Sequence, residues 1–246
     1  YNCYYLLIAL TELGKKMKIA ADFSKRVVVH SEKLEWVASP MAGVHRRPLD
    51  RVGDEVARAT SIVRYAPGSE FSPHIHTGGE EFLVLDGVFQ DEHGDYPVGS
   101  YIRNPPQSKH KPGSQGGCVI FVKLWQFQPQ DRQHVCLHTK KMQGVTHPQF
   151  NNVSVISLYK DNFEEVSLLH FKPNADMVIN AKDGAELLVL EGLLNEQTDT
   201  LIKNSWLRVP INSTVNAKAG STGATVWLKT GYLTDVANQI TRLKNA

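Results

Sequence analysis

The segment Pro67–Gly87, PGSEFSPHIHTGGEEFLVLDG, decides the fold. It contains three potential metal ligands, His74, His76 and Glu80, and Glu81 follows directly. Side chains on a strand alternate between two faces, so the imidazoles of His74 and His76 are expected to point to one face. The residues TGG can turn the chain, and EFLVLDG then returns as a second strand. Such a hairpin brings a carboxylate close to two imidazoles.

A fourth ligand is expected from a later strand, and His110 in NPPQSKH is the candidate. Two or three histidines with one carboxylate suit zinc, iron, manganese, nickel or copper rather than calcium. We therefore predict a site for one divalent transition metal (zinc, iron, nickel or manganese), formed by His74, His76, Glu80 and His110. Glu81 is the alternate ligand, or a partner for an imidazole N–H.

Composition indicates a folded protein that does not bind nucleic acid or membranes. The chain has 246 residues, of which 41% are hydrophobic and 21% charged. It could form one large β domain or two of about 100–150 residues each. The net charge is +2 without a long basic or acidic block, which argues against both nucleic-acid and membrane-surface binding.

The cysteines are Cys3, Cys118 and Cys136, and there is no CxxC motif. A disulfide framework is therefore not expected, and a reducing, cytoplasmic location is the default. The apolar run from Tyr4 to Leu10 is too short to span a bilayer. Met17 has the features of a natural start, so residues 1–16 are interpreted either as an extension or as an addition to the natural chain.

Short runs rich in Val, Ile, Phe and Tyr follow, separated by Gly, Pro and Asp. Examples are RVVVH, SIVRYAP, FLVLDG and CVIFVKLWQF. Helical periodicity is limited to DVANQITRLKN near the C-terminus. Regularly spaced strands of this kind predict an all-β sandwich or barrel.

The sequence also repeats itself. FLVLDGVF at Phe82–Phe89 is echoed by LLVLEGLL at Leu187–Leu194, an offset of 105 positions (190 − 85). At the same offset, YIR at 101–103 meets WLR at 206–208. Matches that occur in the same order in both halves predict a duplicated domain, and the boundary between the copies is expected in the polar stretch 130–151.

The predicted metal ligands have no counterparts in the second copy. At the 105-residue offset each ligand meets an apolar residue, so we interpret the second copy as structural. The pairs are His74 and Ile179, His76 and Ala181, Glu80 and Ala185, and His110 and Val215.

Three parts of the chain are predicted from these patterns. Residues 1–38 form an N-terminal extension and a first strand. Residues 39–130 form the metal-binding domain, and residues 131–246 form a second, degenerate domain without metal ligands.

The motif itself resembles a known family. Gly68, His74, His76, Glu80 and Gly87 meet the pattern G-x5-H-x-H-x3-E-x6-G. This is similar to the first motif of the cupin superfamily, whose fold is a small antiparallel jelly-roll barrel. The x6 spacing before the last glycine favours the first of the two adjacent glutamates as the ligand.

A second cupin motif is loosely met by GDYPVGSYIRNPPQSKH at residues 94–110. The phrases ARATSIVRYAPGSEF and GCVIFVKLWQF resemble more narrowly the ChrR-type cupins. The resemblance implies two tandem cupin-type jelly-roll barrels, a bicupin, in which the first barrel binds one metal and the degenerate second barrel supports it. ChrR anti-sigma factors also carry a zinc-binding H-x3-C-x2-C domain. That motif does not occur in this sequence, so sigma-factor binding is not expected.

These features leave three hypotheses for function. The first is a metal-dependent small-molecule enzyme of dioxygenase type. The second is a non-catalytic metal-binding sensor or regulatory cupin. The third is a purely structural metal that stabilises the barrel. No catalytic residue is identified outside the ligands, and the expected partners are a small-molecule substrate and, since cupins often dimerise through their sheets, a second copy of the chain.

Overall fold

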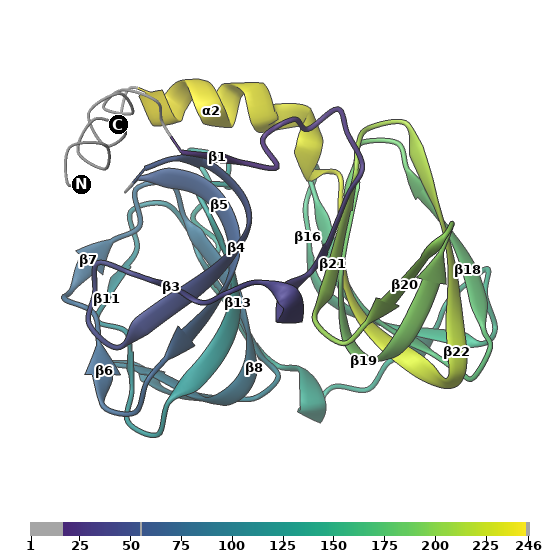
Figure 1. Cartoon of the computed structure of the whole chain (residues 1–246), viewed down its shortest axis with the longest axis horizontal. Coiled ribbons are helices and arrows are strands. Elements are labelled where there is room, and N and C mark those ends of the chain that lie inside the picture. Colours follow the sequence, from purple (N-terminus) through teal and green to yellow (C-terminus); the bar gives the residue numbers. More distant parts are fainter. Residues whose placement is uncertain (1–16, 55, 245–246) are drawn as a thin grey trace, which may run out of the picture.

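The computed structural model describes residues 17–54 and 56–244. It consists mainly of antiparallel strands, arranged as two barrels side by side (Figure 1). The predicted all-β class is confirmed. The interpretation of residues 1–16 lies outside the described residues.

The first barrel is built on a sheet with the strand order β1-β4-β5-β13-β8-β10-β14, and β7 and β11 form a separate two-stranded sheet. Its strands are β1 (Lys18–Ile19), β3 (Val37–Ala38), β4 (Val44–Gly53), β5 (Ala57–Tyr65), β6 (Ser69–Glu70), β7 (His74–Ile75), β8 (Glu80–Asp91), β9 (Gly94–Pro97), β10 (Ser100–Asn104), β11 (Lys109–His110), β12 (Gly113–Ser114), β13 (Cys118–Leu124) and β14 (Val135–His138).

The second barrel is built on a sheet with the order β15-β16-β17-β22-β19-β21-β2. Its strands are β2 (Val27–His30), β15 (Val145–Thr146), β16 (Val153–Lys160), β17 (Glu165–Phe171), β18 (Asp176–Ala181), β19 (Ala185–Glu196), β20 (Asp199–Ile202), β21 (Ser205–Val209) and β22 (Ser213–Thr230). The helical segments are η1 (Ser31–Lys33), η2 (Thr139–Lys141), η3 (Tyr232–Asp235) and α2 (Val236–Lys244).

The sequence repeat corresponds to a repeat in strand pairing. In the first barrel Leu83 of β8 lies opposite Tyr101 of β10. In the second barrel Leu188 of β19 lies opposite Trp206 of β21. Both pairs are buried, because alternate residues of these strands face apolar neighbours.

The two barrels exchange strands. β2, which lies in sequence between β1 and β3 of the first barrel, pairs with β21 of the second. β14, which precedes the second barrel, pairs with β10 of the first. Each sheet therefore contains a strand from beyond a predicted domain boundary, which lies after residue 38 or after residue 130. Those boundaries stay predictions.

The surface between the barrels has its own apolar core. Leu83 and Phe121 of the first barrel belong to one buried cluster with Leu188 and Trp227 of the second. The rings of Phe121 and Trp227 meet edge to face, with centroids 5.0 Å apart. Burial of such aromatic surface is a main source of stability, so the barrels are packed against each other rather than only tethered.

Two buried ion pairs cross the same surface in opposite directions. Glu81 of the first barrel accepts a hydrogen bond from Lys229 of the second at 2.6 Å. Lys123 of the first barrel pairs with Glu186 of the second. All four side chains are almost fully buried, so their charges need partners within the protein; Lys229 has a second one in its own barrel, Glu164, at 2.8 Å.

Helix α2 lies across the end of the first barrel (Figure 1). Gln239 of the helix accepts a hydrogen bond from Arg58 at 2.7 Å. None of the described helices is long and apolar enough to cross a membrane.

Candidate metal centre

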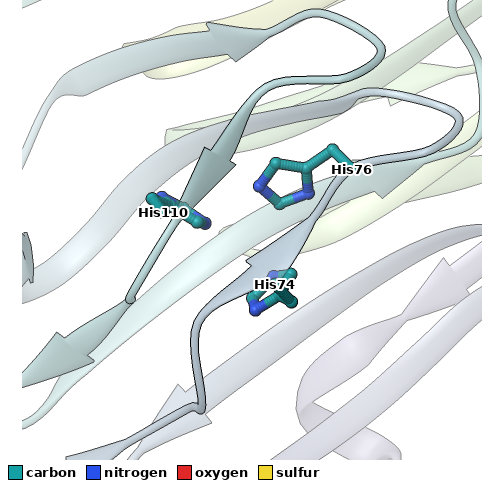
Figure 2. A group of neighbouring side chains, drawn as sticks. All are labelled: His74, His76 and His110. Carbon is teal, nitrogen blue, oxygen red and sulfur yellow. The ribbon is translucent and has the colours of Figure 1, made fainter.

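Three of the predicted ligands lie on one narrow ribbon of backbone. β7 and β11 pair so that His74 lies opposite His110. The ribbon continues at His76, whose N–H donates to Ser108 O at 2.9 Å and whose carbonyl accepts from Gln107 N–H at 2.8 Å. Figure 2 shows the three imidazoles close together, with His74 and His76 on one backbone segment and His110 on the neighbouring one. Their ligand atoms all lie within 4.8 Å of one another.

The histidine cluster is largely shielded from water. His76 is 7% exposed and His110 is 3% exposed. Among the described residues, the Nε2 atoms of both side chains are buried without a hydrogen-bond partner. A buried, unpaired polar atom costs about 1–3 kcal/mol. A metal ion that accepts their lone pairs would remove this cost, so the donor set fits a transition metal.

Hydrogen bonds at Nδ1 orient two of the rings. His74 Nδ1 lies 3.0 Å from the carbonyl oxygen of Ser72, and His110 Nδ1 lies 3.1 Å from Asp91 Oδ2. A carbonyl oxygen and a carboxylate only accept, so Nδ1 is the donor in both contacts. Each ring therefore keeps its lone pair on Nε2, the tautomer that a metal requires.

Glu80, the predicted carboxylate ligand, borders the cluster. Its Oε2 lies 3.5 Å from His76 Nε2 and 3.4 Å from His110 Nε2. Asn104 donates a hydrogen bond to the same oxygen at 3.3 Å. One carboxylate oxygen thus faces the two unpaired imidazole nitrogens, where a bound cation would meet all three.

Glu81 lies on the opposite face of β8. Its carboxylate accepts hydrogen bonds from Tyr101 O–H and Lys229 Nζ, each at 2.6 Å. The structure does not bring it to the histidines, because adjacent residues of a strand point to opposite faces. Glu81 is a residue of the surface between the barrels, and the interpretation as an alternate ligand or imidazole partner is corrected accordingly.

The surroundings shift the pKa values of these groups in different directions. Burial lowers the pKa of His76, which favours the neutral, ligating form. Burial also lowers the pKa of His110. The hydrogen bond to Asp91 and the charge of Glu80 have a larger, opposite effect, so the pKa of His110 is raised overall. Burial raises the pKa of Glu81, and the charges of Lys229 and Arg103 outweigh this and lower it to about 2.

The turn between His76 and Glu80 is tightly packed. A Cβ on Gly78 would lie 2.2 Å from the Trp125 ring, and a Cβ on Gly79 would lie 2.4 Å from Phe127. Gly79 also has a positive φ of 78°. The two glycines therefore allow close approach of aromatic rings as well as a turn.

Sequence reasoning missed Asp91, Asn104 and Trp125. Asn104 lies opposite Glu80 in the β8–β10 register, so correct strand pairing could have found it. Asp91 and Trp125 gave no signal of their own, since their contacts with the site depend on how separate hairpins pack.

The second barrel has an apolar core where the first has ligands. Ile179, Ala181, Ala185 and Val215 are all buried in its main hydrophobic cluster. Ile179 of β18 lies opposite Val215 of β22, in the way that His74 lies opposite His110. In the described chain, the histidine cluster that could hold a metal is in the first barrel.

Comparisons with known proteins agree with this architecture. Residues 24–128 match the family model described as the ChrR Cupin-like domain. No curated protein sequence matches the chain at a significant level.

Solved structures are similar over most of the chain. A candidate dioxygenase from Nostoc punctiforme has a TM-score of 0.68 and 17% identity, over 85% of this chain and 84% of that one. Escherichia coli Ylba has a TM-score of 0.66 and 13% identity, over 89% and 96%. A bacterial pirin from Escherichia coli in complex with nickel(II) has a TM-score of 0.63 and 11% identity, over 84% and 99%. At these identities the likeness shows the fold alone.

Proposed function

We propose that the chain, whose residues 24–128 match the ChrR cupin-like domain, is a metal-dependent small-molecule enzyme of dioxygenase type. One divalent transition metal would be held in the first barrel by His74, His76, His110 and Glu80. The observation that carries the proposal is the pair of buried, unpaired Nε2 atoms that face one carboxylate oxygen.

The residues around the site would have two roles, to bind the metal and to orient its ligands. The three imidazoles and Glu80 would occupy four positions of an octahedral ion and leave two for a substrate and a second small molecule. When bound, the metal supplies Lewis-acid or redox chemistry. The carbonyl of Ser72 and the carboxylate of Asp91 hold the tautomers of His74 and His110.

The wall beside the histidines is aromatic. Phe71 packs on His74 with ring centroids 5.9 Å apart, and Phe89 packs on His110 at the same distance. Tyr65 contacts both phenylalanines. Such a wall restricts access of water and favours a small, partly apolar substrate.

The experiment is metal analysis followed by oxygen uptake. Protein purified without nickel affinity resin should hold one transition metal per chain and consume O2 with Fe(II) and a substrate from a panel of 1,3-diketones. His74→Ala should remove the metal, whereas His93→Ala, at an exposed histidine outside the cluster, should keep it. Unchanged metal content in His74→Ala would refute the site.

A second function is a metal-binding sensor or regulatory cupin, which the match to the ChrR cupin-like domain favours. Tightly held zinc without oxygen uptake for any substrate would support this reading over the enzyme. Sigma-factor binding is not part of the proposal.

A further inference from the structure

Asp91 is the last residue of β8, the strand that begins at Glu80. Its side chain is 6% exposed, and its Oδ2 lies 3.1 Å from His110 Nδ1. One strand therefore supplies a carboxylate to each side of the same imidazole: Glu80 lies 3.4 Å from Nε2, and Asp91 contacts Nδ1.

The position of Asp91 is fixed by other hydrogen bonds. Its Oδ1 accepts from His93 N–H at 2.8 Å and from Tyr96 O–H at 3.1 Å. The β8–β9 hairpin closes at this point, where Asp91 lies opposite Gly94. Because Oδ1 is held by the hairpin, Oδ2 is left pointing at His110.

The other oriented histidine is held differently. His74 Nδ1 contacts the neutral backbone carbonyl of Ser72. A carboxylate is a stronger acceptor than a carbonyl, and a hydrogen bond from Nδ1–H to an anion increases electron donation from Nε2. His110 is thus the imidazole whose strength as a ligand depends on a charged side chain.

We propose that Asp91 is a positioning residue that fixes the tautomer of His110 and increases its affinity for the metal. The inference rests on the proposed metal binding, which it deepens. Asp91 does not touch the ion in this assignment; it acts through the imidazole.

The test compares four variants by metal affinity, measured by chelator competition with Zn²⁺ and Co²⁺. Asp91→Ala should weaken binding about 10–100-fold, the usual cost of losing such a partner. Asp91→Asn keeps the shape and a neutral acceptor, so its loss should be smaller. Tyr96→Phe removes one of the bonds that orient the same carboxylate, so its loss should be smaller than that of Asp91→Ala, whereas Asp95→Asn changes an exposed aspartate bonded to Gln90 and should stay near wild type.

Two further readouts separate positioning from stability. In metal-free protein, the ¹⁵N shifts of His110 should show protonated Nδ1 in wild type and a mixture of tautomers in Asp91→Ala. The visible absorption of the Co²⁺ protein should change in both Asp91 variants and not in Asp95→Asn. Thermal melting of the metal-free variants shows whether they fold. If Asp91→Ala does not fold, the isosteric Asp91→Asn takes its place in the comparison.

The outcomes distinguish the two proposals. If wild type binds metal and the Asp91 variants bind it with the same affinity and spectrum, the role of Asp91 is refuted and the metal site stands. If wild type itself binds no transition metal, the proposed function is refuted and the role of Asp91 falls with it.

Discussion

The β7–β11 pair of the first barrel and the β18–β22 pair of the second have the same arrangement and opposite chemistry. In the first, His74 lies opposite His110. In the second, Ile179 lies opposite Val215, and both are buried in the core. The strands form in both cases, so the backbone arrangement does not require metal ligands. The histidine cluster and the strand pairing beneath it are therefore separable features of the fold.

The largest effect is expected when the four proposed ligands of the first barrel are replaced by the residues found at the equivalent positions of the second. The variant should lose all bound metal, because every proposed ligand is gone, yet keep its fold, because apolar residues replace imidazoles whose buried Nε2 atoms lack partners. Metal content and circular dichroism measure the two effects. The four changes are His74→Ile, His76→Ala, Glu80→Ala and His110→Val.

Metal-free wild type is the reference for this variant. If the variant unfolds at a temperature at which metal-free wild type stays folded, the replaced side chains also stabilise the first barrel. Strand pairing and ligand residues would then not be independent. His93→Ile, at an exposed position, controls for the loss of a histidine as such.

The next effect concerns the reciprocal ion pairs. Glu81→Gln removes one of two carboxylates from Lys229, which keeps Glu164 at 2.8 Å, and should lower the free energy of unfolding by about 1.5–3 kcal/mol. Glu186→Gln should cost more, about 3–5 kcal/mol, because it removes the carboxylate that pairs with the buried Lys123. Urea unfolding measures both. The exposed Glu165 is the control, and its change to Gln should have little effect.

The contribution of Glu81 should depend on pH in a defined direction. Its pKa falls from the ordinary 4.5 to about 2 in the folded protein, so its stabilisation is fully present above pH 4.5 and lost as the pH falls through about 2. The stability difference between wild type and Glu81→Gln should therefore stay constant from neutral pH to about pH 5 and narrow below that. A gap that widens on acidification would contradict the assignment.

A smaller effect is expected at the turn between the ligands. Gly78→Ala places a Cβ 2.2 Å from the Trp125 ring, and should cost about 1–3 kcal/mol of stability. Metal affinity should fall too, because the displaced turn joins His76 to Glu80. Trp fluorescence and chelator competition report the two changes. Gly116→Ala, where a Cβ would meet nothing within 4 Å, should leave both unchanged.

The smallest effect tests the exchanged strands. His30 of β2 contacts Ser205 Oγ through Nδ1 at 2.9 Å, so Ser205→Ala should cost about 1 kcal/mol. His138 of β14 lies opposite Ser100, but its Nδ1 has no hydrogen-bond partner among the described residues. Ser100→Ala should therefore cost less than Ser205→Ala in thermal unfolding. Equal costs would show that the two contacts are equivalent in solution.

The histidine cluster could be predicted from sequence because its geometry is local. HxH on a strand sets His74 and His76 two residues apart, and a cupin-like spacing placed Glu80 and His110. The barrel class followed from short strands and turns for the same reason. In each case the pattern lies within a few residues or within one repeat.

The remaining features depend on contacts between distant residues. The x6 spacing favours Glu80 as the ligand, but only the facing of β8 shows that Glu81 lies away from the histidines, at the surface between the barrels. Asp91 reaches His110 through the fold of a hairpin. The pairing of β2 with β21 joins segments more than a hundred residues apart, and no periodicity in either strand reveals its partner.

The strand exchange also bears on why a barrel without metal ligands stays in the chain. Residues 39–130 alone would lack β14, leaving the β10 edge unpaired, and would keep Lys123 without Glu186. An open edge invites aggregation, and an unpaired buried charge opposes folding. Residues beyond 130 thus stabilise the first barrel in two ways: β14 pairs with the β10 edge, and Glu186 of the second barrel neutralises Lys123.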